Sequence, residues 1–313
     1  MQITVDRLSP VIQPDSVWVC TTRDLAGEVA TQLPEVPGEQ ILAEPEGRNT
    51  APAIAWAVSE MPQEVQKGVV AVLPADHFIT DLQGFRDTLI AAGEIAAAER
   101  RIMTLGVQPT RAETGYGYLQ VGPDLGEATG LREVVRFTEK PEPDTAQQFF
   151  DSGDYLWNAG MFVFPGELLL ERVAQLQPEI DRGLAAARRE PEKLDTIYGQ
   201  LPAISIDHAI MERLQDMGTL PLDCGWSDLG SWEALWELLT RDANGNVLQG
   251  STVAIDSTDS LIYADHGTVA VVGVEGLVVV KTEDTVLVIP KERSQEVRRI
   301  IAALKESGQI ALL

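Results

Sequence analysis

The sequence predicts an α/β fold, in which a doubly wound, mostly parallel sheet is followed by a small C-terminal β domain. Strand-like runs alternate with helix-like patterns up to residue 107, as in consecutive βαβ units. One run, residues 69–73, is uniformly apolar and stops at a carboxylate, which is typical of a strand buried on both faces that ends in a loop. After Trp236, short β-rich runs follow one another between turn signals, which indicates a separate β unit.

The first third of the chain carries the alternation. The expected strands are residues 17–21, 40–44, 69–73 and 102–107, and the expected helices are 23–33, 50–58 and 82–99. Pro34 ends the first of these helices because proline has no backbone N–H and its ring clashes with the preceding turn. Thr50 is expected to cap the second helix, which carries Pro52 in its first turn.

The rest of the chain is less regular. The expected strands are residues 134–138, 160–164, 276–280 and 285–289, and the expected helices are 143–152, 166–190 and 293–307. The last helix places Val297, Ile300, Ile301 and Leu304 on one face, and Gly308 can end it. We expect two domains, residues 1–240 and residues 241–313.

Charge is the unusual feature of the composition. The 313 residues include 24 basic and 48 acidic side chains, for a net charge of −24. Such a field repels nucleic acid and anionic membranes, so neither is expected as a partner. It also repels phosphate groups at long range, so a phosphate site must create a local positive region from Arg, Lys and Mg²⁺.

Two further expectations concern the compartment. The sequence contains no run of roughly 18 apolar residues and no basic N-terminal region followed by an apolar stretch, so we expect a cytoplasmic protein. Cys20 and Cys224 lie in unrelated contexts and are expected to be reduced core thiols. His77, His208 and His266 are scattered without the spacing of a zinc site.

Two candidate sites lie where an expected strand or loop meets a helix. Asp76 follows the strand at 69–73, and ligands of open α/β sheets bind at such carboxyl ends, so Asp76 is a candidate metal or phosphate-site residue. Alternatively, it only turns the chain or caps the next helix. Arg48, Asn49 and Thr50 precede a helix N-terminus, which favours anions or polar edges. The alternative is an ordinary capped helix with a solvated arginine.

Three later motifs have weaker signals. Gly115 and Gly117 permit close backbone approach to a ligand, or form a bulge. Glu139 and Lys140 place an acceptor beside a cation after an expected strand, although such pairs are usually solvated surface. Asp228 is a second candidate metal ligand, or alternatively the N-cap of the next helix.

These motifs belong to a longer ordered series. In chain order they are Glu44-Pro45-Glu46-Gly47-Arg48-Asn49-Thr50, Leu73-Pro74-Ala75-Asp76-His77, Glu113-Thr114-Gly115-Tyr116-Gly117-Tyr118, Phe137-Thr138-Glu139-Lys140-Pro141, Trp157-Asn158-Ala159-Gly160, Ser205-Ile206-Asp207-His208-Ala209-Ile210-Met211-Glu212 and Trp226-Ser227-Asp228-Leu229-Gly230-Ser231-Trp232. Over residues 8–310 the series closely resembles the bacterial mannose-1-phosphate guanylyltransferases, which are sugar-phosphate nucleotidyltransferases.

The resemblance implies a fold, a reaction and a set of roles. The fold is Rossmann-like, of the nucleotide-diphospho-sugar transferase type, with a C-terminal left-handed β-helix through which a homodimer forms. The reaction transfers GMP from GTP to α-D-mannose 1-phosphate and gives GDP-mannose and pyrophosphate. The implied catalytic residues are Asp76, Lys140 and Asp228, with Mg²⁺ on Asp76 and Asp228. The implied nucleotide-binding residues are Glu44, Arg48, Asn49, Thr50 and Asp76. The implied sugar-phosphate-binding residues are Gly115, Tyr116, Gly117, Glu139, Lys140, Asn158 and Asp207.

One part of the family pattern is absent. The family begins with a strand and a Gly-Gly-x-Gly-Thr-Arg loop, but the sequence has no Gly-Gly dipeptide, and residues 1–10 resemble the helix that follows that loop. We therefore expect the first strand and the phosphate loop to be missing. The alternatives are a catalytically impaired truncated chain, a non-catalytic sugar-nucleotide-binding subunit, or a guanylyltransferase for another sugar 1-phosphate.

Overall fold

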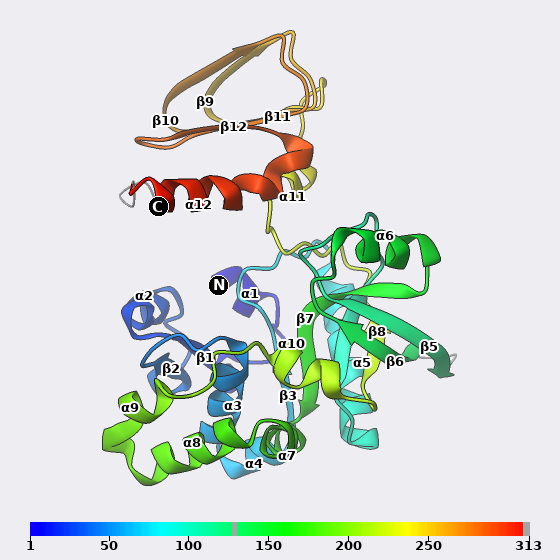
Figure 1. Cartoon of the computed structure of the whole chain (residues 1–313), viewed down its shortest axis with the longest axis vertical. Coiled ribbons are helices and arrows are strands. Elements are labelled where there is room, and N and C mark those ends of the chain that lie inside the picture. The colour runs from blue at the N-terminus through cyan, green and yellow to red at the C-terminus, as the bar shows by residue number, and fades with distance from the viewer. Residues whose placement is uncertain (127–129, 309–313) are drawn as a thin grey trace. The chain divides into compact units, whose positions relative to one another are not determined.

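The computed structural model describes residues 1–126 and 130–308, which form two compact units, Met1–Trp226 and Ser227–Leu313 (Figure 1). The division by compactness falls before the expected boundary at residues 240 and 241. None of the described helices is both long enough and apolar enough to span a membrane.

The first unit contains most of the helices and two sheets. Its strands are β1 (Val19–Thr22), β2 (Ile41–Glu44), β3 (Val69–Val72), β4 (Met103–Val107), β5 (Tyr118–Gly126), β6 (Leu131–Thr138), β7 (Tyr155–Pro165) and β8 (Gly218–Pro221). Its helices are α1 (Gln2–Asp6), α2 (Arg23–Gln32), α3 (Thr50–Glu60), α4 (Gln63–Lys67), α5 (Leu82–Glu99), α6 (Pro143–Ser152), α7 (Gly166–Leu176), α8 (Pro178–Arg189), α9 (Leu194–Tyr198) and α10 (Ile206–Ala209).

The larger sheet is mixed. Its strand order is β3-β7-β4-β8-β6-β5, with a further pairing between β7 and β5. Strand β7 runs antiparallel to β3, β4 and β5, whereas β4 and β8 are parallel. Because β7 lies between β3 and β4 and opposes both, those two strands point the same way. The predicted α/β fold is confirmed, but this sheet is mixed rather than mostly parallel, because β7 and the β5–β6 pair run antiparallel to their neighbours.

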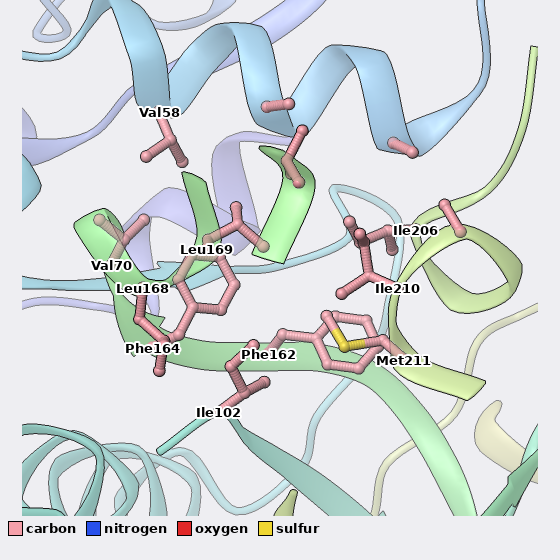
Figure 2. Packing of buried hydrophobic residues seen from close by; sticks show 14 of the residues in the cluster. Val58, Val70, Ile102, Phe162, Phe164, Leu168, Leu169, Ile206, Ile210 and Met211 are labelled. Carbon is pink, nitrogen blue, oxygen red and sulfur yellow. The ribbon is translucent and has the colours of Figure 1, made fainter. Parts of the chain in front are cut away.

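Helices cover both faces of this sheet, and the alternation of side chains along β7 shows how. Phe162 and Phe164 belong to a core shared with α3, α7 and α8. Met161 and Val163 point to the opposite face and join a second core shared with α5. Figure 2 shows the first core, where Phe162 and Phe164 on β7 lie among the apolar residues of the helices. Successive side chains of a strand point to opposite faces, so β7 contributes residues to the core on each face of the sheet.

Strands β1 and β2 form a separate two-stranded parallel sheet. An apolar groove of about 900 Å³ lies between β1 and β3 and is lined by both strands, α1 and α3. The prediction that residues 69–73 are buried on both faces is therefore wrong, because β3 lines the groove and Val69 is 38% exposed. Glu44, Thr50 and Asp207 line the same groove.

One predicted helix is two. Residues 166–190 form α7 and α8, and the break falls at Gln177, whose backbone lies outside the helical range. Pro178 explains the break, because a proline disfavours the helical conformation of the residue before it and begins a helix well.

The second unit is the predicted small β domain. Its elements are α11 (Trp232–Leu238), β9 (Val247–Ile255), β10 (Leu261–Val272), β11 (Leu277–Lys281), β12 (Val286–Pro290), the 3₁₀ helix η5 (Lys291–Glu296) and α12 (Val297–Glu306). Strands β9, β10 and β11 pair in parallel, and β12 closes the sheet antiparallel to β11. Val247, Leu261 and Val278 form its core. The predicted terminal helix begins as η5, and Ile300 and Ile301 of α12 are exposed.

We predict that Gly166→Ala destabilises the first unit. A Cβ at residue 166 would lie 2.8 Å from the carbonyl oxygen and 3.0 Å from the Cα of Gln66. Both atoms belong to the backbone, so the junction between β7 and α7 must shift, at a cost of about 1–3 kcal/mol. The midpoint of thermal unfolding is therefore expected to fall.

Gly27→Ala in α2 is the matched control, because a Cβ there would meet nothing within 4 Å. It removes unfolded-state entropy and is expected to leave the midpoint unchanged or to raise stability by about 0.4–1 kcal/mol. Equal midpoints for Gly166→Ala and the unsubstituted chain would contradict the prediction.

Candidate active site

Asp76 lies on an exposed loop that other side chains hold from both sides. Thr4 Oγ1 donates a hydrogen bond of 2.8 Å to Ala75 O, and the buried Arg7 guanidinium donates to His77 O. On the other side, Trp226 Nε1 donates to His77 Nδ1 over 3.1 Å. The loop is therefore fixed on either side of Asp76.

The Asp76 carboxylate is exposed, and in the part of the chain that the structure describes it makes no hydrogen bond or ion pair. It does not cap the next helix. That position belongs to Asp81, whose Oδ1 accepts from the backbone N–H groups of Gln83 and Gly84 at 3.1 and 3.0 Å. The helix-cap alternative for Asp76 is therefore wrong, and its oxygens remain available to a ligand.

The N-terminus of α3 differs from the prediction in its cap. Asn49, not Thr50, is the N-cap, and its Oδ1 accepts from Thr50 N at 2.8 Å. Thr50 is the first residue of the helix. Ala51 N donates to Ile204 O at 3.1 Å, and Pro52 has no N–H. A helix N-terminus leaves four N–H groups without a partner in the helix. Here two of them are already hydrogen-bonded, and a third is absent because the residue is proline. This terminus suits side-chain contacts to a polar edge better than backbone binding of a phosphate.

Glu44 and Arg48 lie on either side of a turn that leads into α3. The buried Glu44 carboxylate accepts a hydrogen bond of 2.7 Å from Tyr198 Oη. Burial and this carboxylate raise the pKa of Tyr198 far above its usual range, so the phenol keeps its proton and donates. Arg48 pairs with Glu46 at 2.8 Å and is a quarter exposed. Both predicted residues are therefore held by protein partners.

Glu139 and Lys140 follow β6 and form an ion pair in which the acid is largely buried and the base is exposed. Lys140 Nζ lies 2.9 Å from Glu139 Oε1. The Glu139 side chain is only 10% exposed, whereas that of Lys140 is 58% exposed. The pair is therefore not a solvated surface pair, because its acid faces inward and its ammonium group faces outward.

The loop at residues 115–117 packs against this pair. A Cβ at Gly117 would lie 2.6 Å from Glu139 Oε2, so the glycine makes room for the protein's own carboxylate. Gly115 N donates to Glu113 Oε1 at 2.9 Å. The Tyr116 ring packs edge-on against Trp157, with centroids 5.1 Å apart.

Asn158 lies buried on β7 at the centre of a polar chain. Its backbone N–H donates to Gly117 O at 2.8 Å. In its side chain, Oδ1 accepts from Thr104 Oγ1 at 2.8 Å and Nδ2 donates to Asp207 Oδ1 at 3.2 Å. Burial and the nearby Glu139 carboxylate raise the pKa of Asp207 to about 6. The predicted sugar-phosphate residues are thus linked to one another.

Residues 204–212, termed here the bridging segment, connect this group to the predicted nucleotide residues. On the nucleotide side, Ile206 N donates to Thr50 Oγ1 at 2.8 Å, and Ile204 O accepts the Ala51 N–H described above. Ser205 caps α10 by accepting from His208 N at 3.3 Å.

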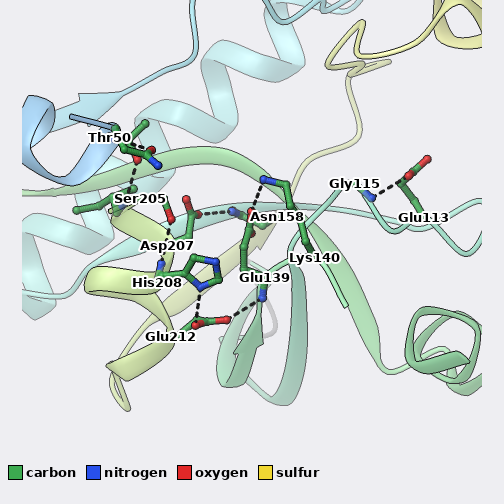
Figure 3. Close-up of polar contacts among 12 residues, drawn as sticks. Thr50, Glu113, Gly115, Glu139, Lys140, Asn158, Ser205, Asp207, His208 and Glu212 are labelled. Carbon is green, nitrogen blue, oxygen red and sulfur yellow. Dashed lines mark hydrogen bonds and ion pairs between the residues drawn. The ribbon is translucent and has the colours of Figure 1, made fainter. Parts of the chain in front are cut away.

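On the side of the predicted sugar-phosphate residues, Asp207 of the bridging segment contacts Asn158, and Glu212 contacts the backbone at Glu139. Glu212 Oε1 accepts from Glu139 N at 2.9 Å, and Glu212 Oε2 lies 3.0 Å from His208 Nδ1. Figure 3 shows these residues gathered around α10, with Thr50 at one end and Lys140 at the other. The segment therefore fixes both groups to one framework.

Asp228 belongs to the second unit. Its Oδ1 accepts from Gly230 N at 2.9 Å across a turn in which Leu229 adopts a φ of 51°. The N-cap of α11 is Ser231, whose Oγ accepts from Ala234 N at 3.1 Å. The helix N-cap alternative for Asp228 is therefore wrong.

The donor set can be compared with what Mg²⁺ requires. Within residues 1–126 and 130–308, no three His, Cys, Asp or Glu side chains gather closely enough to hold a metal ion. Mg²⁺ commonly takes only one or two carboxylates and fills its other positions with phosphate oxygens and water. The exposed Asp76 carboxylate fits that limited demand. Asp228 is also an acid, but its Oδ1 already accepts from Gly230 N.

Two residues that organise the site, Glu212 and Thr104, are not among the predicted site residues. Glu212 closes the Ser205–Glu212 string, and its spacing of four from His208 places both on one helical face, which is a usable signal. Thr104 lies in a buried strand, where a β-branched residue is common, so its hydroxyl carries no separate signal.

Comparisons with known proteins cover both units. A family model described as "Nucleotidyl transferase" matches residues 1–245, and one described as "MannoseP isomerase/GMP-like beta-helix domain" matches residues 250–304. Mannose-1-phosphate guanylyltransferase from Klebsiella pneumoniae is 38% identical, over 98% of this chain and 67% of the relative. Xanthan biosynthesis protein XanB from Xanthomonas campestris pv. campestris (strain B100) is 37% identical, over 99% of this chain and 67% of the relative.

A solved structure is similar to this chain over almost its whole length. The crystal structure described as mannose-1-phosphate geranyltransferase from Thermus thermophilus has a TM-score of 0.84 and 35% identity, and covers 97% of this chain and 88% of that chain. The second family model confirms that the small β domain is β-helix-like. The chain is a nucleotidyltransferase, and it belongs to the family of bacterial mannose-1-phosphate guanylyltransferases.

Proposed function

We propose that the protein transfers GMP from GTP to α-D-mannose 1-phosphate and releases pyrophosphate. The observation that carries the proposal is the bridging segment, which ties Thr50 at the start of α3 to Asn158, Glu139 and Lys140. A transfer between two phosphate-bearing substrates needs two binding groups held at a fixed separation. The names of the relatives supply the sugar and the nucleotide.

The chemistry asks mainly for alignment and neutralisation of charge. A phosphate oxygen of mannose 1-phosphate forms a bond to the α-phosphorus of GTP, and the bond from that phosphorus to the oxygen bridging to the β-phosphate breaks. The electron pair leaves with pyrophosphate. Lys140 presents its exposed ammonium group to the sugar phosphate, and Glu139 beside it is available to a sugar hydroxyl group. The buried Asn158 supports this group through its bonds to Thr104 and Asp207.

The nucleotide is assigned to the other side of the bridging segment. Asn49 and Thr50 offer side-chain polar atoms at the start of α3, with Arg48 beside them. Asp76 would hold Mg²⁺, with Asp228 as a second candidate ligand, and the ion would neutralise phosphate charge and help to orient the triphosphate. A homodimer through the C-terminal domain and a cytoplasmic location stay predictions, and light scattering during size-exclusion chromatography tests the first.

We predict that Lys140→Ala weakens the binding of mannose 1-phosphate by about ten- to a hundredfold, which corresponds to the loss of one hydrogen bond to a charged group. Calorimetric titration of the full chain measures the dissociation constant. Lys193→Ala is the control, because Lys193 pairs with Glu190 on the surface near α9. Unchanged affinity of the Lys140→Ala variant would remove Lys140 from the site.

We predict that Asp76→Asn and Asp228→Asn each lower Mg²⁺-dependent formation of GDP-mannose at least about tenfold. Loss of even an indirect partner of a metal costs about 10–100-fold in affinity or activity. The Mg²⁺ concentration that gives half the maximal rate should rise in both variants. Asp24→Asn, at an exposed acid in α2, is the control. A variant whose rate depends on Mg²⁺ concentration as the unsubstituted chain's does would rule out the substituted carboxylate as a ligand.

We predict that Asp207 makes the free energy of unfolding fall as pH rises from about 4 to about 6. In the folded state the Asp207 carboxyl has a pKa of about 6, whereas the usual value for an aspartate is 3.8. The folded state therefore binds more protons across this interval, and stability decreases with pH. In Asp207→Asn this contribution is absent, while the amide oxygen can still accept from Asn158.

Urea unfolding at several pH values tests this expectation. The difference in stability between Asp207→Asn and the unsubstituted chain should shift in favour of the variant as pH rises through this interval. A difference that stays constant across the interval would show that Asp207 titrates normally.

A further inference from the structure

We propose that Glu212 is a positioning residue that holds Lys140 in the conformation that receives the sugar phosphate. The inference rests on the proposed function, because it assigns a support to the cation of that site. Glu212 does not face the substrate directly in this assignment. It acts through the backbone at Glu139.

The backbone at Lys140 needs support. Lys140 has a φ of 45°, in the left-handed region that a residue with a side chain seldom occupies. Such a conformation persists only where the surrounding contacts determine it. Strained backbone of this kind is found preferentially at binding and catalytic sites.

Two consecutive N–H groups anchor this turn. Lys140 N donates to Tyr116 O at 3.2 Å, and Glu139 N donates to Glu212 Oε1 at 2.9 Å. The first acceptor is a backbone carbonyl, which few substitutions can remove. The second is a side-chain carboxylate, and a hydrogen bond to an ionised acceptor is shorter and stronger than one between neutral groups. Glu212 is thus the side chain on which the turn depends.

Glu212 is itself held on a fixed element. It lies in the 3₁₀ helix η4 (Met211–Arg213), and the preceding residues Ile210 and Met211 are fully buried in the core. Its second oxygen, Oε2, lies 3.0 Å from His208 Nδ1. Figure 3 shows the carboxylate of Glu212 between His208 and the chain at Glu139. The acceptor is therefore held by its own element and by His208.

The consequence is a specific division of roles. The Glu139 carboxylate pairs with the Lys140 ammonium group. The backbone N–H of Glu139 donates to the Glu212 carboxylate. Loss of Glu212 releases the backbone but leaves the Lys140 charge present. The affinity for a sugar phosphate should then fall because the ammonium group is no longer preorganised, and binding must order it.

Calorimetric titration of the full chain with mannose 1-phosphate tests this role. Glu212→Ala is expected to weaken binding by about three- to tenfold, the cost of ordering the Lys140 side chain on binding, and Glu212→Gln, whose amide oxygen can still accept from Glu139 N, by less than about twofold. Glu171→Ala, at a surface acid paired with Arg100, is the matched control. Equal affinity of Glu212→Ala and the unsubstituted chain, or equal loss in Glu212→Gln and Glu212→Ala, would overturn the proposal.

A double-mutant cycle separates positioning from a merely structural role. If Glu212 acts through Lys140, the variant with both Lys140→Ala and Glu212→Ala should bind as weakly as Lys140→Ala alone. Losses that multiply would overturn the proposal. If Glu212→Ala does not fold, Glu212→Gln combined with amide hydrogen exchange decides. The Glu139 N–H should remain protected in Glu212→Gln, and exchange there as fast as in a mobile loop would overturn the proposal.

Binding measurements distinguish a failure of the proposed function from a failure of the proposed role of Glu212. If the unsubstituted chain does not bind mannose 1-phosphate, the proposed function fails and the role of Glu212 falls with it. If the unsubstituted chain binds and Glu212→Ala binds equally well, only the role of Glu212 fails.

Discussion

Strand β7 hydrogen-bonds to β3, β4 and β5, and its two faces supply the two main cores of the first unit. It runs antiparallel to β3 and β4 and separates these two strands, which point the same way. The same strand carries Asn158 into the interior, where Thr104 and Asp207 complete its hydrogen bonds. A buried amide left unpaired would cost the desolvation of its polar atoms, so this chain of contacts constrains the strand, the bridging segment and the site together.

The bridging segment extends that constraint from one half of the site to the other. Its buried residues Ile206, Ile210 and Met211 fix it in the core, and its polar groups contact the start of α3 and the turn at Lys140. Apolar burial thus holds the bridging segment rigid, and its hydrogen bonds fix the distance between the start of α3 and the turn at Lys140. The proposed transfer between two phosphate-bearing substrates requires such a fixed arrangement.

Electrostatics explain why the site needs such support. The chain has a net charge of −24, so long-range attraction does not bring anionic substrates to it. A local cation must be held in place instead. Lys140 is held by Glu139, by a left-handed backbone turn and by the Glu212 acceptor. Asp207 lies in the same region, and its raised pKa reflects burial first and repulsion from Glu139 second.

The sequence by itself determined the α/β class, the separate β domain and most of the elements, because strand and helix periods are local properties. The β-helix form of that domain was implied by the family resemblance alone. Helices 82–99 and 143–152 lie where they were predicted. It also determined the motif residues, through their order along the chain. Only the tertiary structure decided how they are supported. Asn49 rather than Thr50 caps α3, because Thr50 Oγ1 accepts from Ile206, distant in sequence. Likewise, the anchor of Lys140 is Glu212, and no local pattern joins these two residues. Contacts between distant segments depend on how the cores pack, which a local period does not encode.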